Sequence, residues 1–280
     1  MTQPSEPIAL VTGASSGIGK ATASLLAING FRVFGTSRRP ESEPQRPYEL
    51  LPMDVRSDAS VKAAIQIIFD KVGRIDLLVN NAGYAQAGAI EETSLAEVQA
   101  QFETNVFGML RVTDAVLPSM RRQGFGRIIN ISSVFGYVAP PHFGVYAGSK
   151  FAVEGLSESL RSELRPFNIH VSLVVPGFVK TNLVSQLPVK PLADYKPREQ
   201  IGLAFVDKGV ERGMDPKLIA QTILHIATVA HPRLRYLIGR ETHLLLTSKR
   251  LLPEPVFEWM RRRAFPAEAT GTLQPQVQSR

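Results

Sequence analysis

One stretch near the N-terminus constrains the fold more than any other, because a short apolar run passes directly into a glycine-rich turn and then into a helical pattern. The apolar run is Ile8-Ala9-Leu10-Val11, the turn is Thr12-Gly13-Ala14-Ser15-Ser16-Gly17-Ile18-Gly19, and the helical pattern continues through Ile28. A strand, a glycine turn and a helix in this order are the context of a dinucleotide site, since the backbone can approach a pyrophosphate at the helix N-terminus. The spacing Gly-x-x-x-Gly-x-Gly departs from the standard Gly-x-Gly-x-x-Gly, so a plain glycine turn is the alternative.

The rest of the chain alternates short apolar runs with helical patterns. This alternation predicts an α/β fold: a Rossmann-type, doubly wound parallel sheet with helices on both faces. Ligands of such sheets bind at the carboxyl ends of the strands, where Gly13, Asn81, Ser133 and Pro176 fall. The expected strands after the first are Arg32 to Thr36, Glu49 to Val55, Asp76 to Asn80, Arg127 to Ser133, His170 to Val175 and Arg235 to Gly239.

The domain organisation follows from the lack of an internal repeat or interdomain linker in 280 residues. We expect one nucleotide-binding domain over residues 1–270 and a disordered polar tail over 271–280. After Pro176-Gly177 the pattern becomes irregular, with several prolines and scattered apolar residues up to Glu211. We interpret this stretch as a loop with short helices, forming a mobile substrate lid over about 183–215. A C-terminal extension over about 240–265 would close the same end.

Composition excludes several classes of function. The chain has no cysteine, so disulfides and thiol chemistry are excluded, and no metal site is predicted. No apolar run approaches the roughly 18 residues needed to span a bilayer, and the first residues do not resemble a secretory signal, so a cytoplasmic protein is expected. The net charge is +7, with an arginine cluster at Arg261-Arg262-Arg263. No basic recognition motif supports nucleic-acid binding, whereas contact of this cluster with an anionic membrane surface stays open.

A tyrosine and a lysine form the candidate catalytic pair. If Tyr146 lies at the start of the helix predicted from Phe151 onward, Tyr146 and Lys150 are four residues apart on one helix face. A nearby ammonium lowers the pKa of a phenol, which suits proton transfer to or from an alcohol or carbonyl oxygen. Ser133 ends an apolar run and offers a hydroxyl to the same oxygen. Taken alone, the pair also fits a solvated surface contact.

The end of the second predicted strand indicates the cofactor. An acid at this place holds the adenosine ribose, whereas basic residues accommodate a 2′-phosphate. This chain has Ser37, Arg38 and Arg39 there and no acid before Glu41. We therefore expect NADP(H) rather than NAD(H). Asp54, after the third strand, either reaches the adenine amino group or caps the next helix.

Together these segments resemble a classical short-chain dehydrogenase/reductase over about residues 7 to 182. The resemblance is carried by the glycine turn, Asn80-Asn81-Ala82-Gly83, Asn105, Ser133, Tyr146-Ala147-Gly148-Ser149-Lys150 and Pro176-Gly177. Residues 183 to 265, with Pro232-Arg233-Leu234-Arg235-Tyr236, more loosely resemble the hydroxysteroid and retinol dehydrogenase branch, including 17β-hydroxysteroid dehydrogenases.

The resemblance implies a catalytic tetrad of Asn105, Ser133, Tyr146 and Lys150. In it Tyr146 exchanges the proton, Ser133 holds the substrate oxygen, Lys150 lowers the tyrosine pKa and bonds the nicotinamide ribose, and Asn105 holds a water that links Lys150 to solvent. The cofactor-binding residues expected from motif and resemblance together are Gly13, Ser15, Ser16, Gly17, Ile18, Gly19, Ser37, Arg38, Arg39, Asp54, Val55, Asn81, Ala82, Gly83, Tyr146, Lys150, Pro176, Gly177, Val179 and Thr181.

The implied activity is NADP(H)-dependent interconversion of an alcohol and its ketone or aldehyde, on a small apolar substrate such as a steroid or retinoid. Two alternatives stay open: a 3-oxoacyl carrier-protein reductase, and a non-catalytic NADP-binding redox sensor. The family also implies a homodimer or homotetramer, with the helices from Leu95 to Leu110 and from Tyr146 to Leu164 at the interface.

Overall fold

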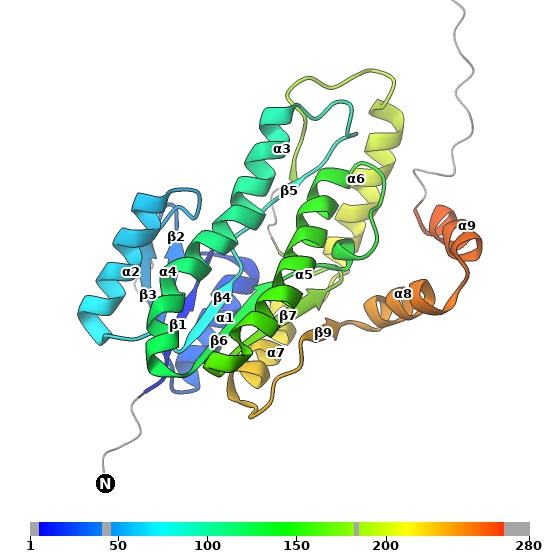
Figure 1. Cartoon of the computed structure of the whole chain (residues 1–280). Coiled ribbons are helices and arrows are strands. Elements are labelled where there is room, and N and C mark those ends of the chain that lie inside the picture. Colours follow the sequence, from blue (N-terminus) through cyan, green and yellow to red (C-terminus); the bar gives the residue numbers. More distant parts are fainter. Residues whose placement is uncertain (1–5, 41–45, 182–184, 266–280) are drawn as a thin grey trace, which may run out of the picture.

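The computed structural model describes residues 6–40, 46–181 and 185–265. Within these ranges, seven strands form one parallel sheet in the order β3-β2-β1-β4-β6-β7-β9 (Figure 1). Helices cover both of its faces, which confirms the expected α/β architecture. The strands are β1 (Ile8–Val11), β2 (Arg32–Ser37), β3 (Glu49–Pro52), β4 (Leu77–Asn80), β6 (Gly126–Ile131), β7 (Ile169–Pro176) and β9 (Arg235–Ile238).

The central strands are buried on both faces, which explains their continuous apolar sequences. In β1, Leu10 packs into the cluster beneath α2 (Asp58–Val72) and α4 (Gly108–Gln123). Its neighbours Ala9 and Val11 point the other way, into the cluster beneath α1 (Gly17–Ile28) and α7 (Pro216–Thr228). Successive side chains of a strand alternate between faces, so one short apolar run supplies both layers of the core.

From β1 the chain continues to β2 on one side of the sheet, and from β4 it continues to β6 on the other side. Strand β2 pairs with one edge of β1, and β4 pairs with the other. The connections after β1 and β4 therefore separate at the carboxyl ends of two adjacent strands and leave a crevice there. Such a crossing point is where open α/β sheets bind their ligands.

The helix predicted from Leu95 to Leu110 contains an irregular turn. It consists of α3 (Leu95–Phe102), a π-helical turn (Glu103–Phe107) and α4, without a break between them. Such turns are rare and occur mostly at functional sites. This one contains Asn105, which is buried.

The prediction of a loop with short helices up to Glu211 is wrong in one respect. After β8 (Ser185–Gln186), which pairs with β5 (Ala85–Gln86), the chain forms a single sixteen-residue helix, α6 (Lys196–Glu211). Pro197 lies in its first turn, where a missing backbone N–H costs nothing. The expected start of the lid at residues 183–184 and the tail at 271–280 lie outside the described residues.

Two further helices follow β9, and Figure 1 shows them on the outer side of the molecule beyond α6. They are α8 (Arg240–Leu251) and α9 (Glu254–Ala264). Among the described residues, no helix combines the length and the apolar character that crossing a membrane requires.

A substitution at Gly19 tests how tightly the first turn is packed. A Cβ atom at Gly19 would lie 2.2 Å from the Gly13 carbonyl oxygen and 2.5 Å from the Asn81 Nδ2 atom. Gly19→Ala is therefore expected to lower the free energy of unfolding by about 2 kcal/mol, as overpacking does. Gly155→Ala in α5 (Gly144–Leu164) is the control, because a Cβ atom there meets no neighbour within 4 Å. Urea unfolding measures both, and equal midpoints for the two variants would contradict the close packing at Gly19.

Candidate active site

The glycine turn after β1 is tied to the end of β4 by reciprocal hydrogen bonds. The Thr12 hydroxyl accepts the backbone N–H groups of Asn81 at 2.9 Å and Ala82 at 3.0 Å. The Asn81 amide donates in return to the carbonyls of Thr12 at 2.9 Å and Gly13 at 3.1 Å. Gly13 and Gly17 have positive φ angles of 66° and 52°, which glycine adopts without strain. The turn is therefore held in a shape that leaves its backbone open toward the crevice.

The N-terminus of α1 is suited to an anion. Its N-cap residue, Ser16, makes no side-chain capping bond, and its first turn holds no acid. By contrast, Ser57 caps α2, Ser94 caps α3 with Glu97, and Asp215 caps α7. Uncapped N–H groups and the helix dipole favour a phosphate at this place. The residues present therefore fit a dinucleotide pyrophosphate.

A cavity of about 380 Å³ runs along this turn and on toward the tips of β2 and β3. Most of the predicted cofactor residues line it. Gly19 instead lies directly beneath the turn, against Gly13. The predicted residues that line the cavity are Gly13, Ser15, Ser16, Gly17, Ile18, Ser37, Arg38, Asp54, Val55, Asn81, Ala82, Gly83 and Thr181.

The two arginines after β2 occupy different places. Arg38 lines the cavity, whereas Arg39 is exposed and contributes only backbone groups to hydrogen bonds with the Ser37 hydroxyl. Arg56, which the sequence interpretation missed, lines the same cavity and forms an ion pair with Asp54 at 2.7 Å. The hydrogen bond from Arg56 lowers the pKa of Asp54. Asp54 does not cap the next helix, because Ser57 does.

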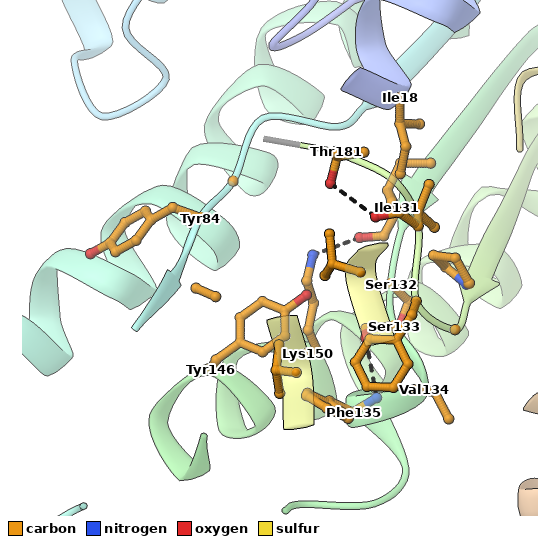
Figure 2. A pocket seen from close by; sticks show the side chains of 18 of the residues that line it. Ile18, Tyr84, Ile131, Ser132, Ser133, Val134, Phe135, Tyr146, Lys150 and Thr181 are labelled. Atoms are coloured by element: carbon orange, nitrogen blue, oxygen red, sulfur yellow. Dashed lines mark hydrogen bonds between the residues drawn. The ribbon is translucent and has the colours of Figure 1, made fainter. Parts of the chain in front are cut away.

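The predicted catalytic pair shares one helix face, as expected. Tyr146 and Lys150 both lie in the first two turns of α5, and both are buried. Figure 2 shows their side chains pointing into one cavity, with Ser133 beside them. The Lys150 ammonium donates to the Ile131 carbonyl at 2.8 Å and lies 5.8 Å from the centre of the Tyr146 ring. Ser133 caps a 3₁₀ turn (Val134–Gly136), accepting the Phe135 N–H at 3.2 Å.

Burial controls the protonation of this pair. It raises the pKa of Tyr146 to about 12, while a side-chain hydrogen bond with Ser133 acts in the opposite direction. Burial lowers the pKa of Lys150 to about 8, and Glu154 opposes that shift. Removal from water penalises whichever form carries charge, so the two shifts have opposite signs. At neutral pH the phenol is protonated and Lys150 is still mainly charged.

Asn105 fixes the loop that faces this pair. Its amide donates to the Tyr84 carbonyl at 3.0 Å and to the Ser149 hydroxyl at 3.2 Å, and its oxygen accepts the Tyr84 N–H at 3.2 Å. A cavity of about 10 Å³ separates Asn105 from Lys150 and is also lined by Asn80 and Ile131. That volume is about the minimum for one water molecule. The π-helical turn therefore places Asn105 beside a polar space that adjoins Lys150.

Besides the nucleotide cavity along the glycine turn, a large cavity of about 250 Å³ lies over the catalytic pair. Phe135 is at the centre of its aromatic wall, with ring centres 5.9 Å from Phe143, 6.1 Å from Tyr146 and 6.1 Å from Phe178. Val206, Asp207 and Val210 of α6 complete it. The predicted Pro176, Gly177, Val179 and Thr181 line this cavity. The residues shared with the nucleotide cavity are Ile18, Asn81, Gly83, Tyr84 and Thr181.

Asp207 differs from the rest of this lining. It is the one carboxylate among the described residues that line the cavity. The Asp207 carboxylate is exposed to solvent, and within the described part of the chain it makes no hydrogen bond or ion pair. Neither Asp207 nor Tyr84 could be identified from the sequence, because no motif marks them.

A comparison with protein families identifies the family of this chain. The model of the short-chain dehydrogenase family matches residues 7–191, which include the glycine turn, Asn105, Ser133, Tyr146 and Lys150. This chain belongs to the short-chain dehydrogenase family. The expected resemblance to that family, made over residues 7 to 182, is therefore confirmed.

Individual relatives extend beyond that core. The chain is 39% identical to a 3-ketodihydrosphingosine reductase of Bacteroides thetaiotaomicron, over 91% of this chain and 96% of that protein. It is 35% identical to the 17-beta-hydroxysteroid dehydrogenase type 1 of Mus musculus, over 82% of this chain and 72% of that protein. The looser resemblance to the hydroxysteroid branch thus rests on a detectable relative. This short-chain dehydrogenase is an oxidoreductase of alcohols or carbonyl compounds.

Solved structures agree with this assignment. A short-chain dehydrogenase from Streptomyces avermitilis is 34% identical, with a TM-score of 0.79, and the match covers 94% of this chain and 98% of that one. A serine dehydrogenase complexed with NADP+ is 26% identical, with a TM-score of 0.71, over 82% of this chain and 94% of that one.

The depressed pKa of Lys150 predicts a pH dependence of stability. Because this pKa falls from its ordinary value to about 8 on folding, the unfolded chain binds more protons between these two values. The free energy of unfolding should therefore rise with pH above about 8, by at most about 1.4 kcal/mol per pH unit. The raised pKa of Tyr146 acts in the opposite direction, so at higher pH it lowers the free energy of unfolding. Lys150→Met should lose the rise due to the lysine and keep this later fall. Identical pH slopes in urea unfolding of the two proteins would contradict the burial of a charged lysine.

Proposed function

We propose that this chain is an NADP(H)-dependent oxidoreductase that interconverts a primary or secondary alcohol with its aldehyde or ketone, on an apolar substrate. The observation that carries the proposal is the convergence of Ser133, Tyr146 and Lys150 in a cavity that shares part of its lining with the nucleotide cavity. One cavity offers a glycine turn and an uncapped helix N-terminus, and the other offers an aromatic wall. A phosphate-bearing cofactor and an apolar carbonyl compound match these two environments.

The catalytic residues act on one substrate oxygen. When bound, NADPH would supply a hydride for the carbonyl carbon, and NADP+ would take one up in the opposite direction. Tyr146, protonated at neutral pH, donates its proton to the carbonyl oxygen while the Ser133 hydroxyl holds that oxygen. The charged Lys150 favours the phenolate that results, as an ammonium does for a neighbouring anion. A water in the small cavity beside Asn105 would return a proton through Lys150.

The preference for NADP(H) is supported by charge near the tips of β2 and β3. Arg38 and Arg56 both line the cavity there, and a guanidinium suits a phosphate group. Asp54 already pairs with Arg56, so Arg38 is the cation with fewer competing contacts. The NADP+ complex of the related serine dehydrogenase supports the same choice.

Two substrate classes fit the apolar cavity. A steroid or retinoid fits the aromatic wall, and the mouse 17-beta-hydroxysteroid dehydrogenase supports that class. A long-chain amino ketone also fits, because the Asp207 carboxylate can hold an ammonium group near the carbonyl. The name of the Bacteroides relative supports this second class. Measuring NADPH consumption with a panel of steroids, amino ketones and acyl thioesters separates these two classes from a 3-oxoacyl reductase. If no compound of the panel causes NADPH to be consumed, the result favours the redox sensor.

The expected assembly is a homodimer or homotetramer. Phe107, Phe151 and Leu156 are exposed apolar residues on the π-helical turn and α5, the elements expected at the interface.

Tyr146→Phe tests the proton donor. The variant keeps the ring and its packing against Phe135 but lacks the hydroxyl, so turnover should fall by about 10²–10⁴-fold while NADPH affinity stays within about twofold. Lys150→Ala should lose both turnover and NADPH affinity. Steady-state rates and NADPH fluorescence titration measure the two properties. More than a tenth of wild-type activity in Tyr146→Phe would remove Tyr146 from its role.

Cofactor choice is tested at the tip of β2. Ser37→Asp combined with Arg38→Leu replaces a phosphate site with an acid that holds a ribose hydroxyl. The ratio of kcat/KM for NADPH to that for NADH should fall by at least about tenfold, the effect of one lost charge-assisted bond. Arg39→Leu is the matched control and should leave the ratio unchanged. Wild-type preference for NADH would refute the assignment outright.

Asp207 decides between the two substrate classes. If the carboxylate holds a substrate ammonium, Asp207→Asn should lower kcat/KM for a long-chain amino ketone by at least about tenfold. The same change should leave kcat/KM for a neutral ketone of equal length within about twofold. Lys208→Gln, next in α6, serves as the control. Equal effects on both ketones would show that Asp207 does not read substrate charge.

A further inference from the structure

The two C-terminal helices, α8 and α9, have one packed face and one face in solvent. On the packed face, Leu245 and Leu246 join the cluster around Phe135 and Tyr146, while Phe257 and Met260 pack against Val138. The helices are therefore docked firmly on the body of the protein. Their outward face is free to carry a separate property.

That outward face is apolar along its middle. Leu251 is 72% exposed, Trp259 is 56% exposed and Val256 is 46% exposed, and Leu244 and Leu252 are exposed as well. Val256, Trp259 and Arg263 follow one another at helical spacings of three and four residues, so they form a stripe on one side of α9. A stripe of large apolar side chains in water is unfavourable unless something covers it.

Basic residues surround the stripe. From Arg240 to Phe265 the chain has six arginines and lysines against three glutamates, a net charge of +3. The Arg263 guanidinium lies 4.1 Å from the centre of the Trp259 ring, and Arg262 pairs with Glu258 one turn earlier. Arg250 is exposed at the end of α8. Indole rings and guanidinium groups side by side are typical of helices that lie in the headgroup layer of a bilayer.

We propose that the outward face of α8 and α9 binds the surface of an anionic lipid bilayer. Leu251, Val256 and Trp259 would enter the headgroup layer, and Arg250 and Arg263 would contact lipid phosphates. The two helices lie on the membrane and do not cross it, in keeping with their lengths of twelve and eleven residues. The proposal does not depend on the substrate or the cofactor assigned above.

Other occupants fit the charges less well. A second copy on a two-fold axis brings the same basic patch against itself, which is repulsive. Residues 266–280 contain one glutamate and one arginine, so they offer no counter-charge. Nucleic acid matches the arginines but leaves the central Leu251, Val256 and Trp259 without an apolar partner. An anionic bilayer supplies both an apolar layer and negative charge.

A second exposed apolar group supplies the comparison. Leu95 and Val189 are 71% and 79% exposed, and Glu97, two residues after Leu95, accepts the Val189 N–H at 2.9 Å. The Glu97 carboxylate makes that surface less suited to an anionic bilayer than the basic outward face of α8 and α9. Variants at Leu95 and Val189 are therefore matched controls for variants on α8 and α9.

The position of the proposed surface relates it to the cavity. Leu245 and Leu246 of α8 belong to the same cluster as Val206, Phe143 and Tyr146, which line the cavity over the catalytic pair. A docked membrane would thus lie one helix away from the wall of the substrate site.

The decisive experiment uses the full chain and the fluorescence of its single tryptophan, Trp259. Vesicles of phosphatidylcholine mixed with phosphatidylglycerol should shift the Trp259 emission to shorter wavelength and carry the protein into the pellet on centrifugation. Vesicles of phosphatidylcholine alone should do neither at the same lipid concentration, and added salt should reverse the binding. No shift and no sedimentation with the anionic vesicles at low salt would overturn the proposal.

Paired variants separate charge from apolar contact. Arg250→Glu with Arg263→Glu should weaken vesicle binding by at least about tenfold, whereas Lys62→Glu with Arg122→Glu, of equal charge, should change it by less than about threefold. Leu251→Ser with Val256→Ser should weaken binding, and Leu95→Ser with Val189→Ser should not. Equal losses within either pair would overturn the proposal. An emission shift that depends on protein concentration in the absence of lipid would assign the face to a second copy instead. A shift produced by duplex DNA but not by vesicles would assign it to nucleic acid.

Discussion

The contact between the end of β1 and the end of β4 is the constraint on which the site depends. Thr12 and Asn81 exchange hydrogen bonds across 69 residues of sequence, and Gly13 and Gly19 allow the two backbones to approach closely. This contact joins the two connections that leave β1 and β4 in opposite directions. It therefore keeps the crevice at a fixed width, holds the N-terminus of α1 toward it and places the residues shared by both cavities.

Burial performs two tasks at the catalytic pair. The aromatic wall around Phe135 keeps water from the phenol of Tyr146, which raises the pKa of this phenol to about 12. The same dry surroundings lower the proton affinity of Lys150, so this lysine is closer to exchanging its proton than a solvated one. An apolar cavity for the substrate and the shifted pKa values of Tyr146 and Lys150 are consequently products of one set of packed side chains.

Features with a local cause could be predicted from the sequence. The strands were predictable because β1, β4, β6 and β7 are buried on both faces, and the pairing of Tyr146 with Lys150 followed from helix geometry alone. Helix α6 was missed because several prolines and scattered apolar residues precede Glu211, although Pro197, in the first turn of α6, is compatible with a helix. Arg56, Tyr84 and Asp207 could not be predicted, since their places in the two cavities depend on how distant segments pack. The π-helical turn was not predicted either, and its residue Asn105 bonds to Tyr84 and Ser149, which lie far from it in the sequence.

The strand order has a consequence for synthesis of the chain. Strand β1 is made first but lies inside the sheet, and its two edges receive β2 and β4, which are complete by residue 80. Afterwards β6, β7 and β9 join one edge in the order in which they are made, so the sheet can extend as the chain leaves the ribosome without displacing a strand already paired. The crevice between β1 and β4 can thus exist early, whereas the wall contributed by α6 arrives more than a hundred residues later. A nascent chain would hold the nucleotide half of the site well before it could enclose a substrate.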